Sequence, residues 1–318
     1  MAENVETVQG TSLWKDAWRR LLKNKLAVFG LIVMVIIIIA VAIGPAIIRW
    51  TTGYTADYIP ADGDLIKSFP PSLNHPMGTD EAGRDLLARV LQGGRISLMV
   101  GVISTIVSLM VGVSYGAIAG YMGGKIDNIM MRIVDIIYAI PYILIVIVLL
   151  SVFGGPNTPT FIQWMSERFG GGQGLSQIFL LFLALGLVSW LTMARVVRGQ
   201  ILSLKNQEFV MAARATGVST PNIIFRHLVP NALGPVIVYA TLTIPSVMLT
   251  EAFLSFLGLG VQAPYASWGS LAADGIKNIA IYPWQLIFPG ATMALTLFSL
   301  NFLGDGLRDA LDPQTRKF

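Results

Sequence analysis

Long apolar runs separated by short charged segments make up most of this chain. Stretches without Asp, Glu, Lys or Arg follow one another at 26–48, 96–124, 136–166, 169–194 and 278–304. A further apolar run, at 232–257, is interrupted by a single acid, Glu251. Each run is long enough for a membrane-spanning helix, which needs about 20 apolar residues.

From these runs we predict an all-α polytopic membrane protein with six transmembrane helices. The spans are expected at about 26–48, 97–120, 131–153, 176–194, 232–257 and 284–303. The composition agrees, because 54% of the 318 residues are hydrophobic and only 13% are charged, against about 25% charged in soluble proteins. The first run is longer than the apolar part of a signal peptide and no small-residue cleavage pattern follows it, so we expect it to remain as a helix.

Basic residues are unevenly divided between the two sides that six spans define. The side that holds both chain ends has 15 of the 22 Lys and Arg, namely Lys15, Arg19, Arg20, Lys23, Lys25, Lys125, Arg132, Arg195, Arg198, Lys205, Arg214, Arg226, Arg308, Arg316 and Lys317. The other side has Arg49, Lys67, Arg84, Arg89, Arg95, Arg168 and Lys277. Because Lys and Arg concentrate in cytoplasmic loops, we predict cytoplasmic termini, at 1–25 and 304–318. The net charge of +4 then reflects topology and not nucleic-acid binding.

The segment 49–95 is expected on the extracytoplasmic side. Irregular backbone is predicted in its first part by Pro60, Pro70, Pro71 and Pro76. After the sequence HPMGTDEAGRD, apolar pairs recur at helical spacing, at 86–87 and 90–91, and Asp80 is a candidate N-cap. These features predict either a short amphipathic helix on the outer membrane surface or a loop helix packed on the bundle.

Small residues recur every four positions in the second predicted span, at Ser104, Ser108, Gly112, Gly116, Gly120 and Gly124. On a helix they form one ridge that lets another backbone approach closely. We expect this ridge, with Gly112, Gly116 and Gly120 as interface candidates, to meet either a partner subunit or a neighbouring helix of the same chain. Kinks are predicted inside the third and fifth spans by Pro141, Pro235 and Pro245.

Two acids lie in or near the apolar runs, where an ionisable group costs about 2.5–3.5 kcal/mol on insertion scales. Asp135 has Arg132 one turn away, so we expect a near-surface ion pair between them. Glu251 has no basic neighbour in the sequence and is expected to face the bundle interior, the pathway or a second subunit. A pathway role and structural hydrogen bonding are equal alternatives for Glu251.

No constellation of residues predicts catalysis. The sequence GVSYG matches a nucleophile pattern around Ser114, but it lies inside an apolar run and that pattern needs a strand–turn–helix context and a histidine base. The sequence GGKI at 123–126 lacks the spacing of a phosphate-binding loop, so we predict no ATP site in this chain. His75 and His227 are predicted on opposite sides of the membrane, and there is no cysteine. We therefore expect no bound cofactor, no metal site and no enzymatic activity.

The longest predicted cytoplasmic loop, 195–231, is expected to contain two short helices. In the first, Phe209, Ala212, Ala213 and Thr216 fall on one side, and Gly217 is the expected stop. The second is expected to start at Ser219 or Thr220, with Pro221 as its first helical residue, and to stop before Pro230. The pair would form either a knob that projects from the membrane or an interfacial helix lying on lipid.

This loop resembles the EAA loop of binding-protein-dependent ABC import permeases, E-A-A-x-x-x-G followed after nine residues by I-x-L-P. Ala212, Ala213, Gly217 and Pro230 occupy matching positions with the matching spacing. The sequence departs from the motif in having Met211 at the glutamate position, His227 at the isoleucine position and Val229 at the leucine position. Glu208, one turn before Met211, offers a carboxylate on nearly the same face.

The resemblance covers nearly the whole chain after about residue 12. Four segments are similar to the C-type permease subunit of dipeptide, oligopeptide and nickel importers, namely HPMGTDEAGRDLLARVLQGGRISL, GYMGGKIDNIMMRIVD, LSFLGLGVQAPYASWG and NFLGDGLRDALDP. The resemblance implies a type I ABC importer permease fold, with a permease core at 96–303. It also implies a heterodimer with a sister permease, two cytoplasmic ATPases that use ATP and Mg, and an extracytoplasmic solute-binding protein.

In such importers the EAA loop is the coupling helix that docks on an ATPase. The residues implied in coupling are Glu208, Ala212, Ala213, Arg214, Gly217 and Pro230. Candidates for the pathway or subunit interface are Glu251 and the three ridge glycines. A dipeptide or oligopeptide is the first expectation for the cargo, with nickel as the alternative. An ion-driven secondary transporter is a less favoured class, because neither a proton or sodium site nor inverted repeats are visible.

Overall fold

The computed structural model describes residues 13–59, 68–169 and 173–311, and within these ranges the regular structure is helical. Five of the described helices are long and apolar enough to cross a membrane, namely α2 (Lys25–Thr52), α3 (Leu86–Met122), α7 (Gln173–Leu204), α10 (Val229–Phe256) and α12 (Trp284–Leu311). A bent pair of helices raises the number to six if it counts as one span. The predicted all-α membrane fold is confirmed.

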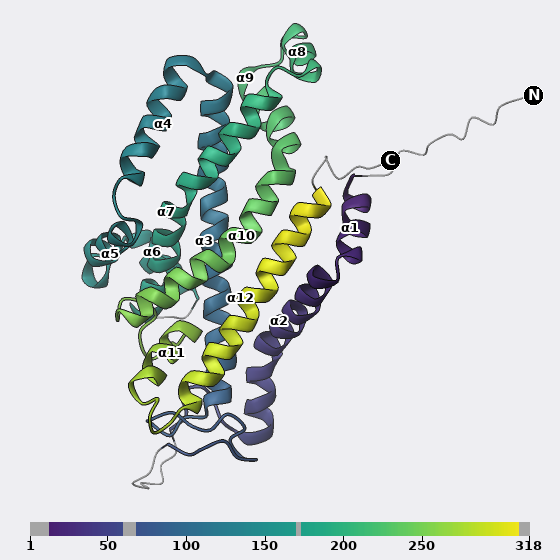
Figure 1. The fold of residues 1–318 in the computed structure, drawn as a ribbon. Helices are drawn as coiled ribbons and strands as arrows, with labels where there is room; N and C mark the ends of the chain where they lie inside the picture. The colour runs from purple at the N-terminus through teal and green to yellow at the C-terminus, as the bar shows by residue number, and fades with distance from the viewer. Residues whose placement is uncertain (1–12, 60–67, 170–172, 312–318) are drawn as a thin grey trace, which may run out of the picture.

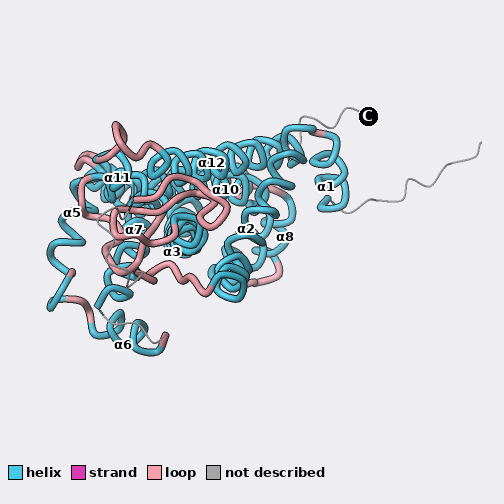
Figure 2. Tube along the Cα trace, turned by 90° about the horizontal axis from the view of Figure 1, so that it is seen from below, coloured by secondary structure: helices cyan, strands magenta, loops and turns pink. Residues whose placement is uncertain are grey.

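Shorter helices lie at both ends of this bundle and along one side. They are α1 (Leu13–Lys23), α4 (Gly124–Tyr138), α5 (Tyr142–Phe153), α6 (Thr160–Arg168), α8 (Glu208–Ala215), α9 (Thr220–Asn222) and α11 (Trp268–Lys277), with a 3₁₀ turn at Gly155–Asn157 and a π-helical turn at Ile223–Leu228. Figure 1 shows α1 and α8 toward one end of the bundle and α11 near the other. Seen from below, in Figure 2, loops cross the end opposite α8.

The first span, α2, begins at a capped turn and contains a proline, Pro45. The side chain of Asn24 accepts hydrogen bonds from the backbone N–H groups of Leu26 (3.1 Å) and Ala27 (3.2 Å), which is a typical N-cap. Pro45 has no N–H to donate to the carbonyl of Val41, four residues earlier. Arg95 of α3 donates to that carbonyl instead, through Nε at 2.9 Å. Arg95 thereby joins α2 to α3 at the point where the proline leaves a carbonyl unpaired.

The second span is longer than predicted, because α3 already begins at Leu86. The expected separate amphipathic helix is therefore the first part of α3, and Asp80 is not its N-cap. Asp85 has that role, with its Oδ1 accepting the N–H of Ala88 at 2.7 Å. Leu86 and Val90 are buried against the rest of the bundle, as in the alternative of a helix packed on protein.

The ridge of small residues on α3 packs against α7 of the same chain. A Cβ atom added at Gly112 would lie 2.7 Å from Cβ of Met193, and one added at Gly120 would lie 2.9 Å from Cβ of Ile201. At Gly116 the added atom would collide with the carbonyl oxygen of Ala194. The three glycines therefore form an internal seam between α3 and α7, and the alternative of a contact with a partner subunit is wrong for this face.

The third predicted span, 131–153, is broken into two helices. α4 and α5 meet at an angle of 83°, with the break between Tyr138 and Tyr142. Pro141 lacks an N–H and disfavours helical backbone at the residue before it, so the first helix cannot continue through it. The expected kink lies at the predicted position, but the prediction of one continuous helix is wrong.

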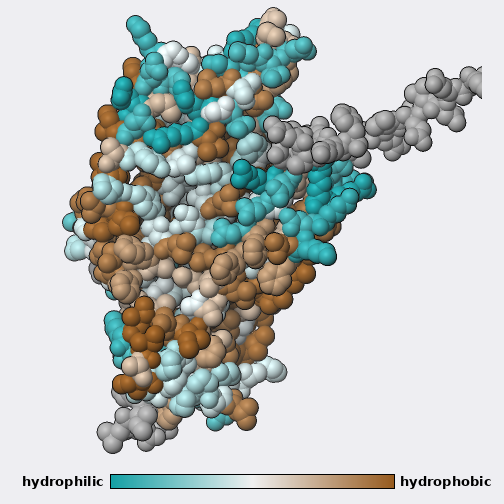
Figure 3. Space-filling view, in the orientation of Figure 1, coloured by the Kyte–Doolittle hydropathy of each residue, from teal (hydrophilic) through white to brown (hydrophobic). Residues whose placement is uncertain are grey.

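The surface of the bundle is divided between hydrophobic and hydrophilic regions. Figure 3 shows hydrophilic residues gathered at the upper end, over α1 and α8, and hydrophobic residues over much of the middle and lower part. On α2 the exposed apolar side chains include Leu26, Phe29, Ile32, Ile36, Ile39 and Ile43. A large exposed apolar surface on this helix is expected for a protein whose solvent is lipid.

Candidate functional site

The segment predicted to couple to an ATPase lies at one tip of the molecule. Its first helix, α8, extends beyond the ends of α7 and α10 in Figure 1. The predicted loop 195–231 is shorter than expected, because α7 continues to Leu204. Val210 and Ala213 are buried and fix α8 to a core cluster that also contains Ile224 and Leu228. α8 is therefore a packed knob and not a free loop.

Gly217 ends α8 as predicted. Its φ of +77° lies in the left-handed region that favours glycine. The N–H of Gly217 donates to the carbonyl of Arg214, and the N–H of Val218 donates to the carbonyl of Ala213, both at 3.0 Å. This pair of bonds is the Schellman arrangement, which satisfies carbonyls that the last helical turn leaves unpaired.

Most of the residues implied in coupling lie on the exposed surface of the knob. Glu208, Ala212, Arg214, Gly217 and Pro230 are exposed, whereas Ala213 is buried and holds the knob in place. Met211, which replaces the motif's acid, is also exposed, at 53%. Arg214 lies over the ring of Tyr121, with its Cζ 5.0 Å from the ring centroid. The outer face of α8 thus presents an apolar side chain flanked by one acid and one base.

The second helix of this segment does not stop before Pro230. α9 leads into the π-helical turn, which continues into α10, so one helical stretch of 37 residues runs from Thr220 to Phe256. Pro230 occupies the first turn of α10. The Nδ2 group of Asn231 donates to the carbonyl of His227 at 2.6 Å, which gives that turn an additional side-chain bond. The segment is thus continuous with a membrane-spanning helix.

Two ion pairs attach α4 to α7 near the same end. The carboxylate of Asp127 accepts two hydrogen bonds from Arg198, from Nε at 2.5 Å and Nη2 at 2.7 Å. Asp135 pairs with Nη2 of Arg195 at 2.8 Å. The prediction that Asp135 pairs with Arg132 is therefore wrong. Sequence reasoning also missed Asp127, because its partner lies 71 residues away.

The Asp127–Arg198 pair, whose carboxylate is buried, is expected to contribute more stability than the exposed Asp135–Arg195 pair. Asp127 is almost fully buried, so Arg198→Gln should lower the free energy of unfolding by about 1.5–3 kcal/mol, the range for hydrogen bonds to charged groups. Arg195→Gln is the matched control on the same helix, and it should cost under about 1 kcal/mol because its pair is exposed. The thermal unfolding midpoints of the two variants are measured in detergent. Equal midpoints would contradict the larger contribution expected of the Asp127–Arg198 pair.

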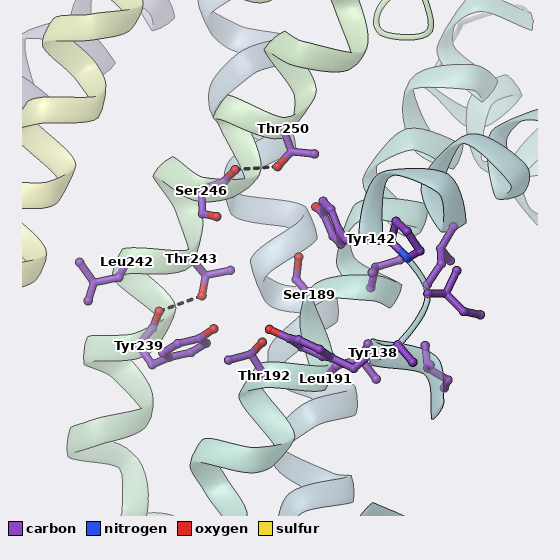
Figure 4. A pocket seen from close by; sticks show the side chains of 16 residues that line it. Tyr138, Tyr142, Ser189, Leu191, Thr192, Tyr239, Leu242, Thr243, Ser246 and Thr250 are labelled. Carbon is purple, nitrogen blue, oxygen red and sulfur yellow. Dashed lines mark hydrogen bonds between the residues drawn. The ribbon is translucent and has the colours of Figure 1, made fainter. Parts of the chain in front are cut away.

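A cavity of about 580 Å³ opens beside the break between α4 and α5. Its walls come from the break itself, α7 and α10. The 16 lining residues include no charged side chain, and eight of them carry a hydroxyl, namely Tyr138, Tyr142, Ser189, Thr192, Tyr239, Thr243, Ser246 and Thr250. In Figure 4 the hydroxyl ends of Tyr138 and Tyr239 point toward one another from opposite walls.

The hydroxyls in this cavity have bonding capacity left for a ligand. Ser189 donates to the carbonyl of Leu185 at 2.8 Å, and Thr243 donates to that of Tyr239 at 2.8 Å, each within its own helix. Ser189 also pairs with Tyr142, and Thr243 with Tyr239. A hydroxyl has one donor and two acceptor lone pairs, so each oxygen still keeps an acceptor site. The cavity therefore suits uncharged polar groups with N–H donors. Sequence reasoning placed Pro141 but could not find these residues, because hydroxyls are ordinary in membrane helices.

Glu251 is buried but does not line this cavity. Its Oε1 accepts hydrogen bonds from the hydroxyls of Ser255 (2.6 Å) and Ser267 (2.7 Å). Ser267 is also the N-cap of α11, where it accepts the N–H of Ser270 at 3.0 Å. Glu251 thus ties the start of α11 to α10. This geometry agrees with the structural alternative for Glu251.

A bundle of membrane-spanning helices with a polar cavity at a helix break agrees with a transport protein of the permease class. The chain belongs to the family of binding-protein-dependent transport system inner membrane components, whose model matches residues 112–317. A second model, the N-terminal TM domain of oligopeptide transport permease C, matches residues 12–71. The chain is accordingly a multi-pass inner-membrane protein, and the predicted family is confirmed.

Several curated relatives are similar over nearly the full length. Oligopeptide transport system permease protein OppC of Haemophilus influenzae is 46% identical, covering 99% of this chain and 94% of its own. The protein of the same name in Escherichia coli strain K12 is 47% identical (97% and 94% covered). Dipeptide transport system permease protein DppC of Bacillus subtilis is 44% identical (96% and 87% covered).

A similar fold occurs in a solved ABC transporter. The match is to a chain of the MetNI methionine ABC transporter in an inward-facing conformation, with a TM-score of 0.50 and 19% identity, covering 71% of this chain and 96% of the other. At this identity the likeness shows the fold alone. It agrees with the predicted type I ABC importer permease fold.

Proposed function

We propose that this chain is a permease subunit of an ATP-driven importer for oligopeptides or dipeptides. Together with a sister permease it forms the pathway for cargo delivered by a solute-binding protein. The observation that carries the proposal is the uncharged, hydroxyl-lined cavity at the break between α4 and α5. Relatives whose names specify oligopeptide or dipeptide transport, at 44–47% identity, support the same cargo.

The cavity chemistry fits a peptide backbone. Every amide of a peptide offers an N–H donor and a carbonyl acceptor, and a hydroxyl can pair with either. A neutral wall does not select for the charge of the cargo side chains, so it accepts different sequences. Peptide is therefore our choice over nickel, for which imidazole or other nitrogen and sulfur ligands would be the natural partners.

Coupling to ATP is proposed to pass through α8. Two ATPase subunits would bind ATP and Mg. The exposed face of α8 would dock on one of them, with contacts from residues at and around this face, namely Glu208, Ala212, Arg214, Gly217 and Pro230. ATP shifts the equilibrium between the open and closed states of the ATPase pair only if it binds one of these states more tightly, here the closed state. Val210 and Ala213 hold α8 in a core cluster with the π-helical turn, which continues into α10, so a displacement of the knob would reach the cavity walls through α10.

Removal of one cavity hydroxyl tests the proposed cargo site. Tyr239→Phe should reduce peptide uptake at subsaturating peptide by about 2- to 10-fold, because a lost hydrogen bond is worth roughly 0.5–1.5 kcal/mol. The measurement is ATP-driven uptake of labelled peptides of graded length into proteoliposomes that hold the complete transporter and its binding protein. Tyr282→Phe, outside the cavity, is the matched control and should transport normally.

The same preparation separates the proposal from its rivals. Copurification of ATPases with this chain in mild detergent, and uptake that needs ATP, are the expected results. Uptake of Ni²⁺ in place of peptide would contradict the cargo. Uptake by the purified chain alone, driven by an ion gradient, would contradict the transporter class.

A further inference from the structure

The short helix α1 lies at the ends of two membrane-spanning helices. Only Asn24 separates it from the start of α2, and it packs on the C-terminal part of α12 (Figure 1). Ala17 and Leu21 of α1 are buried in a cluster with Ala27 of α2 and Ala310 of α12. An α-helix of 11 residues is about 16 Å long. Because both of its neighbours enter or leave the apolar bundle here, α1 lies near the surface of the membrane.

Large apolar side chains are exposed on α1, away from this cluster. Trp18 and Leu22 are four residues apart and so lie on one face of the helix. They are 52% and 49% exposed. The first turns of α2 continue the pattern with Leu26 and Phe29, which are exposed to a similar degree. Exposed apolar residues thus recur from α1 into the helix that has the largest lipid-facing surface.

A row of basic residues runs beside the apolar pair on α1. Lys15, Arg19 and Lys23 recur every four residues along α1, and Lys25 opens α2. All four side chains are exposed. None of them forms an ion pair with another described residue. The cations of this row are therefore free to bind an external anion.

The acids near α1 do not neutralise this row. Asp16 of α1 and Asp309 of α12 each have a contact of their own within the protein. The segments 13–25 and 303–311 together contain six basic residues and three acidic ones. This corner of the molecule therefore has a net charge of +3, and Figure 3 shows its hydrophilic surface over α1. An anionic surface is its electrostatic complement.

We propose that α1 binds anionic phospholipid at the surface of the membrane. Trp18 and Leu22 enter the layer between the headgroups, and the row of basic residues contacts the lipid phosphates. Helices that lie in the membrane interface combine the same two features, apolar aromatic or leucine side chains and flanking Lys and Arg. Tryptophan is enriched at headgroup level for the same reason. An acidic protein segment would match the cations but not the exposed Trp18 and Leu22. The inference goes beyond the proposed transport function and depends on neither cargo nor ATP.

Lipid binding tests this assignment. Phosphatidylglycerol or phosphatidylcholine is titrated into the complete transporter in detergent, and retained lipids are counted by native mass spectrometry. Lys15→Gln with Arg19→Gln should lower the apparent affinity for phosphatidylglycerol at least about ten-fold, because each basic residue near an anionic lipid adds attraction. Binding of phosphatidylcholine should not change.

The matched control is Lys125→Gln with Arg132→Gln, which removes two exposed basic residues of α4 on the same predicted side. This variant should bind phosphatidylglycerol nearly as well as the wild type. Equal losses in the two variants would show a general attraction of the basic side for anionic lipid and would overturn a site on α1.

A spin label locates the apolar face of α1 without any change of charge. The chain has no cysteine, so Leu22→Cys gives it a single labelling site. In nanodiscs that contain phosphatidylglycerol, the nitroxide should collide more often with oxygen, which concentrates in lipid, than with chromium oxalate, which stays in water. Ile36→Cys on α2 is the lipid reference, and Leu73→Cys, at a fully exposed position outside the helices, is the water reference. Preferential collision with chromium oxalate would place Leu22 in water, and exclusion of both reagents would place protein over it. Either result overturns the proposal.

Discussion

Gly116→Val is expected to prevent formation of the folded permease. A Cβ at this position collides with the carbonyl oxygen of Ala194 and lies 3.0 Å from Cβ of Val197. Overpacking usually costs about 1–3 kcal/mol, and here at least the upper end of that range, because a backbone oxygen cannot rotate away. The helices α3 and α7 must then separate along their whole seam. We expect loss of the monodisperse protein in detergent, measured by size-exclusion chromatography and thermal midpoint.

The matched control for this variant is Gly199→Val on α7. A Cβ at Gly199 has no atom within 4 Å, and valine has a higher helix propensity than glycine. This variant should therefore keep the wild-type midpoint or raise it slightly. If the two variants have the same midpoint, the close approach of α3 and α7 is not what holds the bundle together.

Gly217→Val is expected to reduce peptide transport at least about ten-fold while the protein still inserts and folds. A β-branched residue is a severe outlier at a φ of +77°. The left-handed conformation costs an ordinary residue roughly 1–2 kcal/mol. The last turn of α8 would lose its Schellman bonds, and the knob would no longer have one fixed shape for an ATPase. Uptake and ATPase copurification are measured together.

Gly217→Asn provides the control, because asparagine is of similar size to valine and tolerates left-handed backbone. No atom lies within 4 Å of a Cβ at this position, so neither side chain clashes within the chain. The asparagine variant should therefore transport near the wild-type level. Similar activity of the two variants would show that the backbone conformation at this glycine is irrelevant to coupling.

The sequence predicts the parts of the structure that local pattern determines. Apolar runs locate the five long helices, since a span needs a fixed number of apolar residues whatever it packs against. The positive φ at Gly217 and the break at Pro141 follow from covalent constraints on single residues. Motif spacing located the segment from Glu208 to Pro230, whose coupling to an ATPase stays a prediction, and the structure places most of it at the surface.

Contacts between distant segments could not be predicted in this way. The partner of Asp135 is Arg195, 60 residues away, although Arg132 is closer in the sequence. The 83° angle between α4 and α5 depends on what surrounds Pro141, so the proline predicted a bend without its size. The cavity hydroxyls come from three separate regions, and only the folded chain shows that they share one space.

The two sides of α7 are attached by different physical interactions. Toward α3 the contact is a close approach of backbones at Gly112, Gly116 and Gly120, which involves no charge. Toward α4 it depends on the Arg198–Asp127 and Arg195–Asp135 pairs, the second of which is exposed. Ions screen exposed charge pairs but do not act on steric packing. Dissolved salt therefore acts on one flank of α7 and not on the other, which makes α4 the salt-sensitive wall of the cavity.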